Sequence, residues 1–126
     1  MVGVDIVAIA RMERFLDRFG QRALRRFLNE SELPLAKNAA SAAGLWAAKE
    51  AVAKAFGCGI GAELGFHDII ISKDPKGAPR FRLSPKAMER FGPKSCSLSI
   101  AHDGGFAIAV VAVEIDSPAS DKCEEL

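Results

Sequence analysis

Two acidic residues lie in segments that are otherwise apolar. Asp5 interrupts the β-branched run 2–9, and Glu50 lies within the alanine-rich stretch 37–56. An isolated ionised carboxylate is costly to bury, so each of these residues needs a partner. Two carboxylates from separate apolar elements are suited to hold one hard cation such as Mg²⁺, which binds one or two carboxylates and takes its other ligands from water and phosphate oxygens.

Both acids also have simpler explanations. If Asp5 lay at the end of a strand, it would cap the following helix. Glu50 would form an i,i+4 ion pair with Lys54, which is worth about 0.3–0.5 kcal/mol on an exposed helix. A surface pair is unusual on a helix surrounded by alanine, valine and phenylalanine. The residues alone leave both alternatives open.

A glycine-rich loop follows the second acidic segment. Lys54 lies one turn before Gly57, Gly59 and Gly61. Such a loop lets the backbone approach a phosphate closely, with the lysine as a nearby point charge. The loop matches neither the Walker nor the dinucleotide-binding pattern, and its simpler explanation is a helix stop. His102, in a predicted hairpin turn, would contact a phosphate or act as an acid or base, although a lone turn histidine is more often structural or exposed.

Arginine is concentrated near the start of the chain. Residues 10–28 contain six arginines and two acids, for a local net charge of +4, whereas the whole chain carries only +1. At ~100° per residue, Arg11, Arg14 and Arg18 share one helix face. The simpler interpretation is a solvated face, but a face of arginines alone suits a partner rich in carboxylates or phosphates. The small total charge argues against indiscriminate binding of nucleic acids or membranes.

The elements that must position these residues follow from hydrophobic periodicity. Residues 2–9 predict a buried strand, and residues 37–56 predict a central buried helix that ends at Gly57. Further signals predict a helical region at 11–28 that is split at Gly20, followed by a loop or turn at 29–34. They also predict strands at 66–72 and 80–83 around a turn at 74–79, a helix starting at Ser84 and Pro85, and a hairpin of strands 96–101 and 106–115. The pattern predicts an α+β fold with a mostly antiparallel sheet packed against a long central helix.

Length and composition limit the classes of protein to which this chain can belong. The chain has 126 residues, which predicts a single domain at 1–116 followed by a flexible acidic tail at 117–126. Its three cysteines are widely spaced, which fits a reducing compartment better than a disulfide framework or a zinc site. The N-terminus lacks the order of a signal peptide, and no apolar run approaches the ~18 residues of a membrane span. We therefore expect a cytoplasmic protein.

Four segments of the chain, taken in order and spacing, resemble the holo-acyl-carrier-protein synthases, the short class of 4′-phosphopantetheinyl transferases. The segments are VGVDIVAIAR, LWAAKEAVAKAFGCGIG, FHDIIISKDPKGAP and SLSIAHDGGFAIAVV, and the likeness extends over residues 2–113. The resemblance implies the fold of that family and a Mg²⁺-dependent enzyme that supports fatty acid biosynthesis. The enzyme would move the 4′-phosphopantetheine arm of coenzyme A onto a serine of apo acyl carrier protein, with release of adenosine 3′,5′-bisphosphate.

The same resemblance assigns roles to individual residues. It implies Asp5 and Glu50 as metal ligands that act in catalysis together with Lys54. It implies coenzyme A contacts from Lys54, Gly57, Gly59, Gly61 and His102. Carrier protein would bind the basic first helix through Arg11, Arg14 and Arg18. The family further implies a homotrimer with active sites between subunits. The acceptor of the serine proton, either a carboxylate or a metal-bound hydroxide, is left open by the sequence.

The chain departs from the family pattern at four positions. Leu45 stands where many relatives carry arginine, Cys58 where threonine is common, Ala78 in place of lysine, and Ala101 in place of serine. None of these is a predicted metal ligand. The departures therefore affect the expected contacts with coenzyme A and leave the expected reaction unchanged.

Two other classes of function are compatible with the residues. A non-catalytic module would use the arginine face to hold an acidic protein or RNA, and binding to RNA would weaken steeply with salt. A Mg²⁺-dependent phosphoanhydride enzyme would instead use water as the acceptor and would turn over coenzyme A without carrier protein. Only the transferase adds a phosphopantetheine arm to apo carrier protein.

Overall fold

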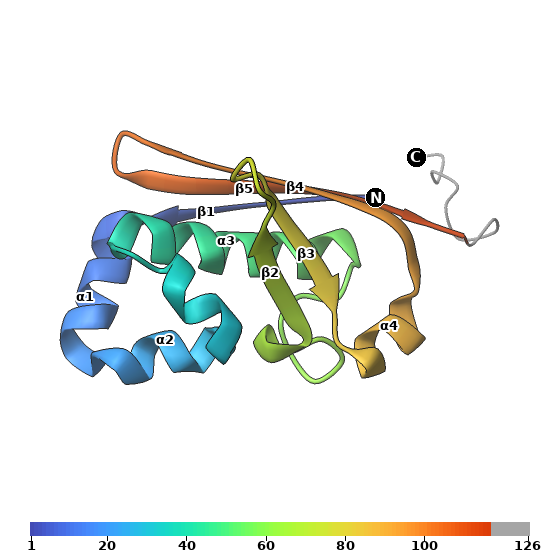
Figure 1. Cartoon of the computed structure of the whole chain (residues 1–126), viewed down its shortest axis with the longest axis horizontal. Helices are drawn as coiled ribbons and strands as arrows, with labels where there is room; N and C mark the ends of the chain where they lie inside the picture. Colours follow the sequence, from blue (N-terminus) through green and yellow to red (C-terminus); the bar gives the residue numbers. More distant parts are fainter. Residues whose placement is uncertain (117–126) are drawn as a thin grey trace, which may run out of the picture.

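A three-stranded antiparallel sheet forms one layer of the molecule (Figure 1). In the computed structural model, which describes residues 1–116, β1 (Val2–Ala8) pairs with β5 (Phe106–Ile115), and β5 pairs with β4 (Pro93–Asp103). Every second residue of β5 from Ala107 to Val113 is buried. The sheet therefore has one inner, buried face and one outer face.

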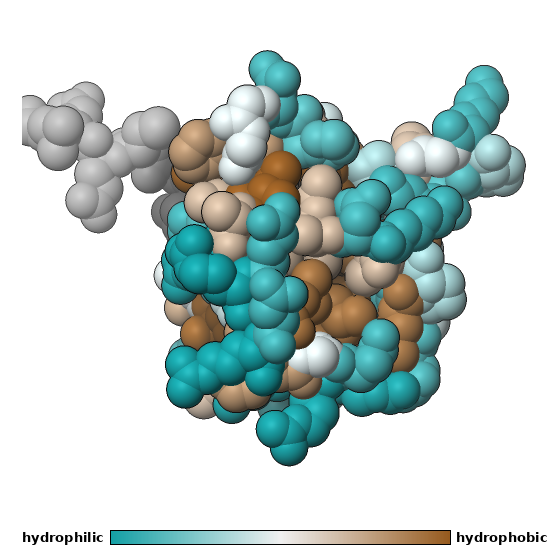
Figure 2. Space-filling model, turned by 90° about the vertical axis from the view of Figure 1, so that its left-hand side faces the viewer, coloured by the Kyte–Doolittle hydropathy of each residue, from teal (hydrophilic) through white to brown (hydrophobic). Residues whose placement is uncertain are grey.

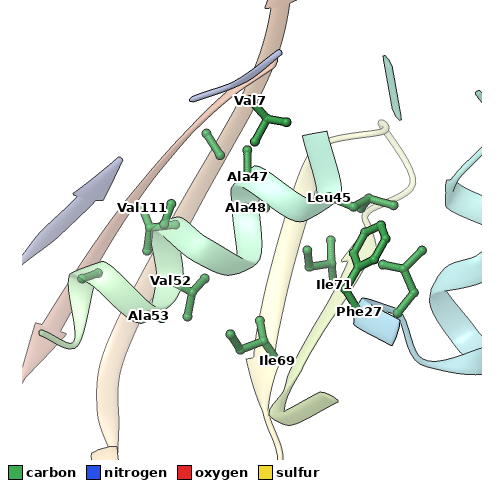
Figure 3. Close-up of a cluster of buried hydrophobic side chains, with 14 of the residues drawn as sticks. Val7, Phe27, Leu45, Ala47, Ala48, Val52, Ala53, Ile69, Ile71 and Val111 are labelled. Carbon is green, nitrogen blue, oxygen red and sulfur yellow. The ribbon is translucent and has the colours of Figure 1, made fainter. Parts of the chain in front are cut away.

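The long helix α3 (Ala39–Ala55) packs along the inner face of this sheet (Figures 1 and 3). Asn38 caps its first turn, since its side chain accepts from the Ser41 N–H at 2.9 Å. The alanine-rich surface of α3 permits a close approach. A Cβ built on Gly3 would lie 1.9 Å from the Ala51 carbonyl oxygen, so only glycine lets β1 approach the helix this closely.

The remaining elements cover the other side of α3, which explains why this helix is buried on nearly all sides. Figure 1 shows α1 and α2 at one end, α4 at the other, and the β2–β3 ribbon between them. These elements are α1 (Ile9–Phe19), α2 (Gln21–Phe27), the 3₁₀ turns η1 (Glu30–Leu35) and η2 (Phe66–Asp68), β2 (Ile69–Lys73), β3 (Pro79–Leu83) and α4 (Pro85–Phe91). Aromatic rings join this layer to α3, with the Trp46 centroid 5.0 Å from Phe27 and 4.7 Å from Phe66.

The predicted α+β class is confirmed, with an antiparallel sheet on a long central helix. The predicted division of the first helical region is also correct, since Gly20 has a φ of 59° between α1 and α2. The central helix ends as expected, with Gly57 at a φ of 77°. Ser84 caps α4 by accepting from the Ala87 N–H at 3.3 Å. The predicted tail 117–126 lies outside the described residues.

The loop or turn predicted at 29–34 is the 3₁₀ turn η1, whose Glu32 side chain accepts from the Asn29 N–H at 2.7 Å. Two predicted boundaries were wrong. The predicted strand at 66–72 begins only at Ile69, because Asp68 closes the turn η2 by accepting from the Gly65 N–H at 2.9 Å. The predicted strand at 96–101 extends over Pro93–Asp103, because β4 pairs along nearly the whole of β5. Within residues 1–116, no helix combines the length and apolarity that a bilayer crossing requires.

Candidate active site

Asp5 lies in the middle of β1, on the face of the strand that packs against α3. It stands opposite Ala109 of β5, and its alternate neighbours Gly3 and Val7 are buried. Its own side chain is 16% exposed. The helix that follows β1 begins at Ile9 without a side-chain cap, so the interpretation of Asp5 as a strand-end cap was wrong. The carboxylate is held between the sheet and α3.

Lys54 of α3 reaches across to this strand. Its Nζ donates to Asp5 Oδ1 at 2.9 Å and to the Val4 carbonyl at 3.2 Å. Among the described residues Lys54 forms its ion pair with Asp5 and none with Glu50, so the predicted local pair between Glu50 and Lys54 was wrong. The lysine joins two elements that lie far apart in the sequence, and its half-exposed ammonium borders solvent.

Glu50 lies one turn before Lys54 on α3, and its carboxyl group interacts electrostatically with Asp5. Burial and then the negative charge of Asp5 raise the pKa of the Glu50 carboxyl, against the opposing effect of Lys54. The pKa of Lys54 is also raised, chiefly by its hydrogen bond with Asp5. The structure thus brings Asp5, Glu50 and Lys54 together as predicted. Two carboxylates and one ammonium leave a negative excess that favours a bound cation.

The donor set of this cluster fits Mg²⁺ better than a softer metal. Asp5 and Glu50 supply carboxylate oxygens, and the described residues contain no group of three His, Cys, Asp or Glu side chains placed to hold a metal ion. A tetrahedral zinc site takes four ligands, usually from Cys and His. Mg²⁺ binds through one or two carboxylates and shares its remaining positions between water and substrate phosphates. The two carboxylates fit that requirement.

The backbone N–H groups of the glycine-rich loop after α3 form hydrogen bonds with carbonyls of α3 and of the loop itself. Gly57 N donates to the Lys54 carbonyl at 2.9 Å, Gly59 N donates to the Ala53 carbonyl at 3.4 Å, and Gly61 N donates to the Leu64 carbonyl at 3.0 Å. The loop therefore ends α3, as the simpler interpretation had it. A Cβ built on any of these three glycines would meet no atom within 4 Å, so a ligand has open space beside the loop.

His102 does not join the cluster within one chain. It lies near the end of β4, is exposed, and stands opposite Ala107 in the register. Asp5 is two strands away and two residues along the sheet, which places the two Cα atoms roughly 12 Å apart at standard sheet spacings. Any role of His102 in the same reaction needs a long substrate or a second subunit.

Arg11, Arg14 and Arg18 lie on the exposed face of α1, as predicted. None of the three forms an ion pair with an acid in residues 1–116. Figure 2, which views the end of the molecule formed by α1 and α2, shows projecting hydrophilic side chains around exposed apolar ones. A mainly apolar hollow opens beside α1, lined by Val7, Arg11, Met12, Phe15 and Trp46. The surface therefore combines unpaired positive charge with an apolar recess.

Two charged residues that sequence reasoning missed are fully buried. Glu32 and Lys49 are each 0% exposed and form an ion pair of 2.7 Å. The signal was a lysine beside Glu50 on a helix with almost no exposed face. Its partner lies 17 residues away in a segment predicted to be a loop or turn. Leu45, where many relatives carry arginine, is 3% exposed and packs in the core (Figure 3).

Comparison with known proteins defines the class that this fold and site belong to. The family model described as "4'-phosphopantetheinyl transferase superfamily" matches residues 1–111. The chain therefore belongs to the 4′-phosphopantetheinyl transferase superfamily.

The relatives narrow this class to one group. A holo-[acyl-carrier-protein] synthase of Campylobacter curvus is 60% identical over 90% of this chain and 99% of its own. The Wolinella succinogenes holo-[acyl-carrier-protein] synthase is 58% identical over 90% and 97%. The crystal structure of the Helicobacter pylori holo-[acyl-carrier-protein] synthase in complex with coenzyme A is 52% identical, with a TM-score of 0.87 over 90% of this chain and all of the other. Within the superfamily, the chain is a member of the holo-[acyl-carrier-protein] synthases.

Proposed function

We propose that this chain transfers the 4′-phosphopantetheine arm of coenzyme A to a serine of apo acyl carrier protein. The reaction releases adenosine 3′,5′-bisphosphate and supplies holo carrier protein for fatty acid biosynthesis. The observation that carries the proposal is the cluster of Asp5, Glu50 and Lys54 at the contact of β1 with α3, in a chain of this family. Chemistry at a pyrophosphate needs neutralised oxygens and an aligned nucleophile, and this cluster suits both.

Asp5 and Glu50 would hold a Mg²⁺ ion, which when bound neutralises charge on the pyrophosphate oxygens of coenzyme A. Lys54 is half-exposed beside Asp5, so its ammonium can also contact a phosphate. Gly57, Gly59 and Gly61 leave open space for the substrate next to this lysine, and His102 would contact a phosphate of coenzyme A. These residues bind and orient the donor.

The transfer itself is a substitution at phosphorus. A bond forms between the serine Oγ and the phosphorus that carries the pantetheine arm. The bond from this phosphorus to the bridging oxygen breaks, and the electron pair leaves with adenosine 3′,5′-bisphosphate. The serine proton goes to a base. Asp5 and Glu50 are the two carboxylates of the cluster that would accept it.

The carrier protein would dock on the arginine face of α1. Arg11, Arg14 and Arg18 are exposed and free of acidic partners within residues 1–116, so they offer guanidinium groups to carboxylates on the partner. The apolar hollow beside Arg11 would accept an apolar side chain from the same partner. Complementary charge chiefly sets the rate and specificity of docking.

The outer face of the three-stranded sheet supports a homotrimer with active sites between subunits. Six apolar side chains of β1 and β5 on this face are 38–68% exposed, namely Val2, Val4, Ile6, Phe106, Ile108 and Val110. A contiguous exposed apolar face of this kind marks an interface. The separation of His102 from Asp5 within one chain also favours a composite site. Light scattering after gel filtration would then give the mass of three 13.4 kDa chains, about 40 kDa, and a mass of one chain would refute the trimer.

The reaction would take place in the cytoplasm, without nucleic acid or membrane as a partner. Cys58 and Cys96, the two cysteines among the described residues, are free thiols, which suits a reducing compartment. The net charge of +1 offers little to polyanions in general.

The proposed function is tested by incubating the chain with coenzyme A, Mg²⁺ and a small acidic apo carrier protein. The carrier protein should gain the mass of one phosphopantetheine arm, and omission of coenzyme A or of Mg²⁺ should abolish the gain. If coenzyme A is cleaved equally fast without carrier protein, water is the acceptor and the proposal is wrong.

A further inference from the structure

The core of this molecule contains one buried ion pair that the proposed chemistry does not use. Glu32 of η1 and Lys49 of α3 are the two fully buried charged residues among residues 1–116. Lys49 Nζ donates to Glu32 Oε1 at 2.7 Å. Removing two charges from water costs several kcal/mol per ion, which their attraction recovers only when the remaining polar atoms are also satisfied.

Both side chains are satisfied, and by backbone groups of separate elements. Glu32 Oε1 also accepts from the Asn29 N–H at 2.7 Å, and Oε2 accepts from the Ile71 N–H of β2 at 2.7 Å. Lys49 Nζ also donates to the Phe66 carbonyl of η2 at 3.0 Å. The pair therefore connects α3 with η1, η2 and β2 through directional bonds, which apolar side chains cannot make.

The connected elements are those that carry the transfer site. Lys49 directly precedes Glu50 on α3, and Phe66 directly follows the loop 57–65. The loop is fixed at its start by the Cys58 and Gly59 N–H groups, which both donate to the Ala53 carbonyl. The Lys49–Phe66 bond fixes its end to the same helix. The bonds of the Lys49 ammonium thus fix how α3 is rotated about its axis, and this rotation sets the direction of the neighbouring Glu50 side chain. The same bonds fix the position of the loop relative to α3.

We propose that Glu32 and Lys49 are positioning residues of the transfer site, which hold the loop 57–65 and α3 in the arrangement that binds coenzyme A. This inference rests on the proposed function. The pair touches no reacting atom, because both side chains are closed off from solvent. Its effect should therefore fall on coenzyme A binding and spare the docking of the carrier protein on the exposed arginines of α1.

Single substitutions are poor tests, because removing one partner leaves an uncompensated buried charge that strongly destabilises the fold. The double variant Glu32→Gln/Lys49→Met removes both charges at similar volume, and the Gln amide oxygen still accepts from a backbone N–H. It should stay folded at some loss of stability, because no buried charge is left unpaired although one backbone N–H and the Phe66 carbonyl lose their partners. Arg90→Gln is the matched control, because it breaks the exposed 3.0 Å pair with Glu63, which also reaches the loop.

Amide hydrogen exchange and steady-state kinetics would be measured on the full chain. In the double variant, amides of residues 57–66 should exchange roughly ten-fold faster and the KM for coenzyme A should rise roughly ten-fold, while the KM for carrier protein stays within about two-fold. The control variant should match the wild type in all three quantities.

Two results would overturn the proposal. One is a folded double variant whose loop exchange and KM for coenzyme A equal those of the wild type. The other is a loss of activity that follows only the unfolded fraction, with both KM values unchanged, which would make the pair merely structural. A wild-type chain without transferase activity would instead refute the proposed function, and the exchange rates would still decide whether the pair holds the loop.

Discussion

Gly3 of β1 offers the sharpest test of how the site is assembled. In a Gly3→Ala variant the new Cβ would lie 1.9 Å from the Ala51 carbonyl oxygen and 2.6 Å from the Ala55 N atom, both of them backbone atoms of α3. Ordinary van der Waals contact begins at 3.4 Å, so β1 and α3 must separate by roughly 1.5 Å. Asp5 lies two residues further along the same face of β1, and the separation moves its carboxylate away from Lys54.

The expected effects are both structural and catalytic. Overpacking of this kind costs about 1–3 kcal/mol of unfolding free energy, which urea titration measures. A shift of about 1 Å in a catalytic group costs on the order of 100-fold in rate, so kcat/KM for carrier protein should fall by about that factor in the fraction that remains folded.

Gly65→Ala is the control for this variant. The Cβ added at Gly65 meets its nearest atom, Asp68 Oδ2, at 3.5 Å, and the residue has an ordinary φ of −87°. It should keep the wild-type free energy of unfolding, and it therefore controls for the addition of a methyl group without a clash. If Gly3→Ala also keeps the wild-type unfolding free energy and kcat/KM, then the close contact of β1 with α3 does not position Asp5, and this account of the site is wrong.

Three further predictions concern other residues. Asp5→Asn and Glu50→Gln should each stay folded by circular dichroism but lose metal-dependent transfer, because each removes a charge at nearly constant size; full activity of both variants at saturating Mg²⁺ would exclude the metal assignment. Arg14→Glu should raise the KM for carrier protein by about ten-fold or more and leave the KM for coenzyme A unchanged, and an unaltered carrier KM would exclude docking on this face. Hydrogen bonds from the Gly65 N–H and from Ser84 hold the pKa of Asp68 below its usual range, so its stabilisation is complete above the unfolded pKa of about 3.9 and is lost as the pH falls through the lower folded pKa. Asp68→Asn should therefore cost about 1 kcal/mol in urea titrations at pH 7 and progressively less below about pH 4, and a cost independent of pH would contradict the assignment.

Sequence periodicity predicted the parts of the fold that local rules determine. The alanine-rich composition of α3, the glycine at its end and the glycine between α1 and α2 are local signals, and the structure agrees with each of them. The same is true of the β4–β5 hairpin, whose turn is formed by Gly104 and Gly105 at positive φ. The predicted cluster of Asp5, Glu50 and Lys54 also assembles in space.

The side-chain pairings that were not predicted depend on contacts between residues far apart in the sequence, which no local pattern contains. Lys54 has an acidic residue one turn away on its own helix, yet it pairs with Asp5, 49 residues earlier, because the strand approaches α3 at Gly3. Glu32 looked like a loop residue since its partners, Lys49 and the Ile71 N–H, lie 17 and 39 residues away. Tertiary hydrogen bonding thus decided the pairing in the site, whereas local bonds over three residues closed the turns η1 and η2.

The most direct test of the central claim is the intact mass of an apo acyl carrier protein after incubation with this chain, coenzyme A and Mg²⁺. The account predicts a gain of one phosphopantetheine arm with the wild-type chain, no gain with a carrier protein whose acceptor serine is replaced by alanine, and a loss of the gain with Glu50→Gln. A carrier protein of unchanged mass, or an equal gain with Glu50→Gln, would contradict the claim that this cluster performs the transfer.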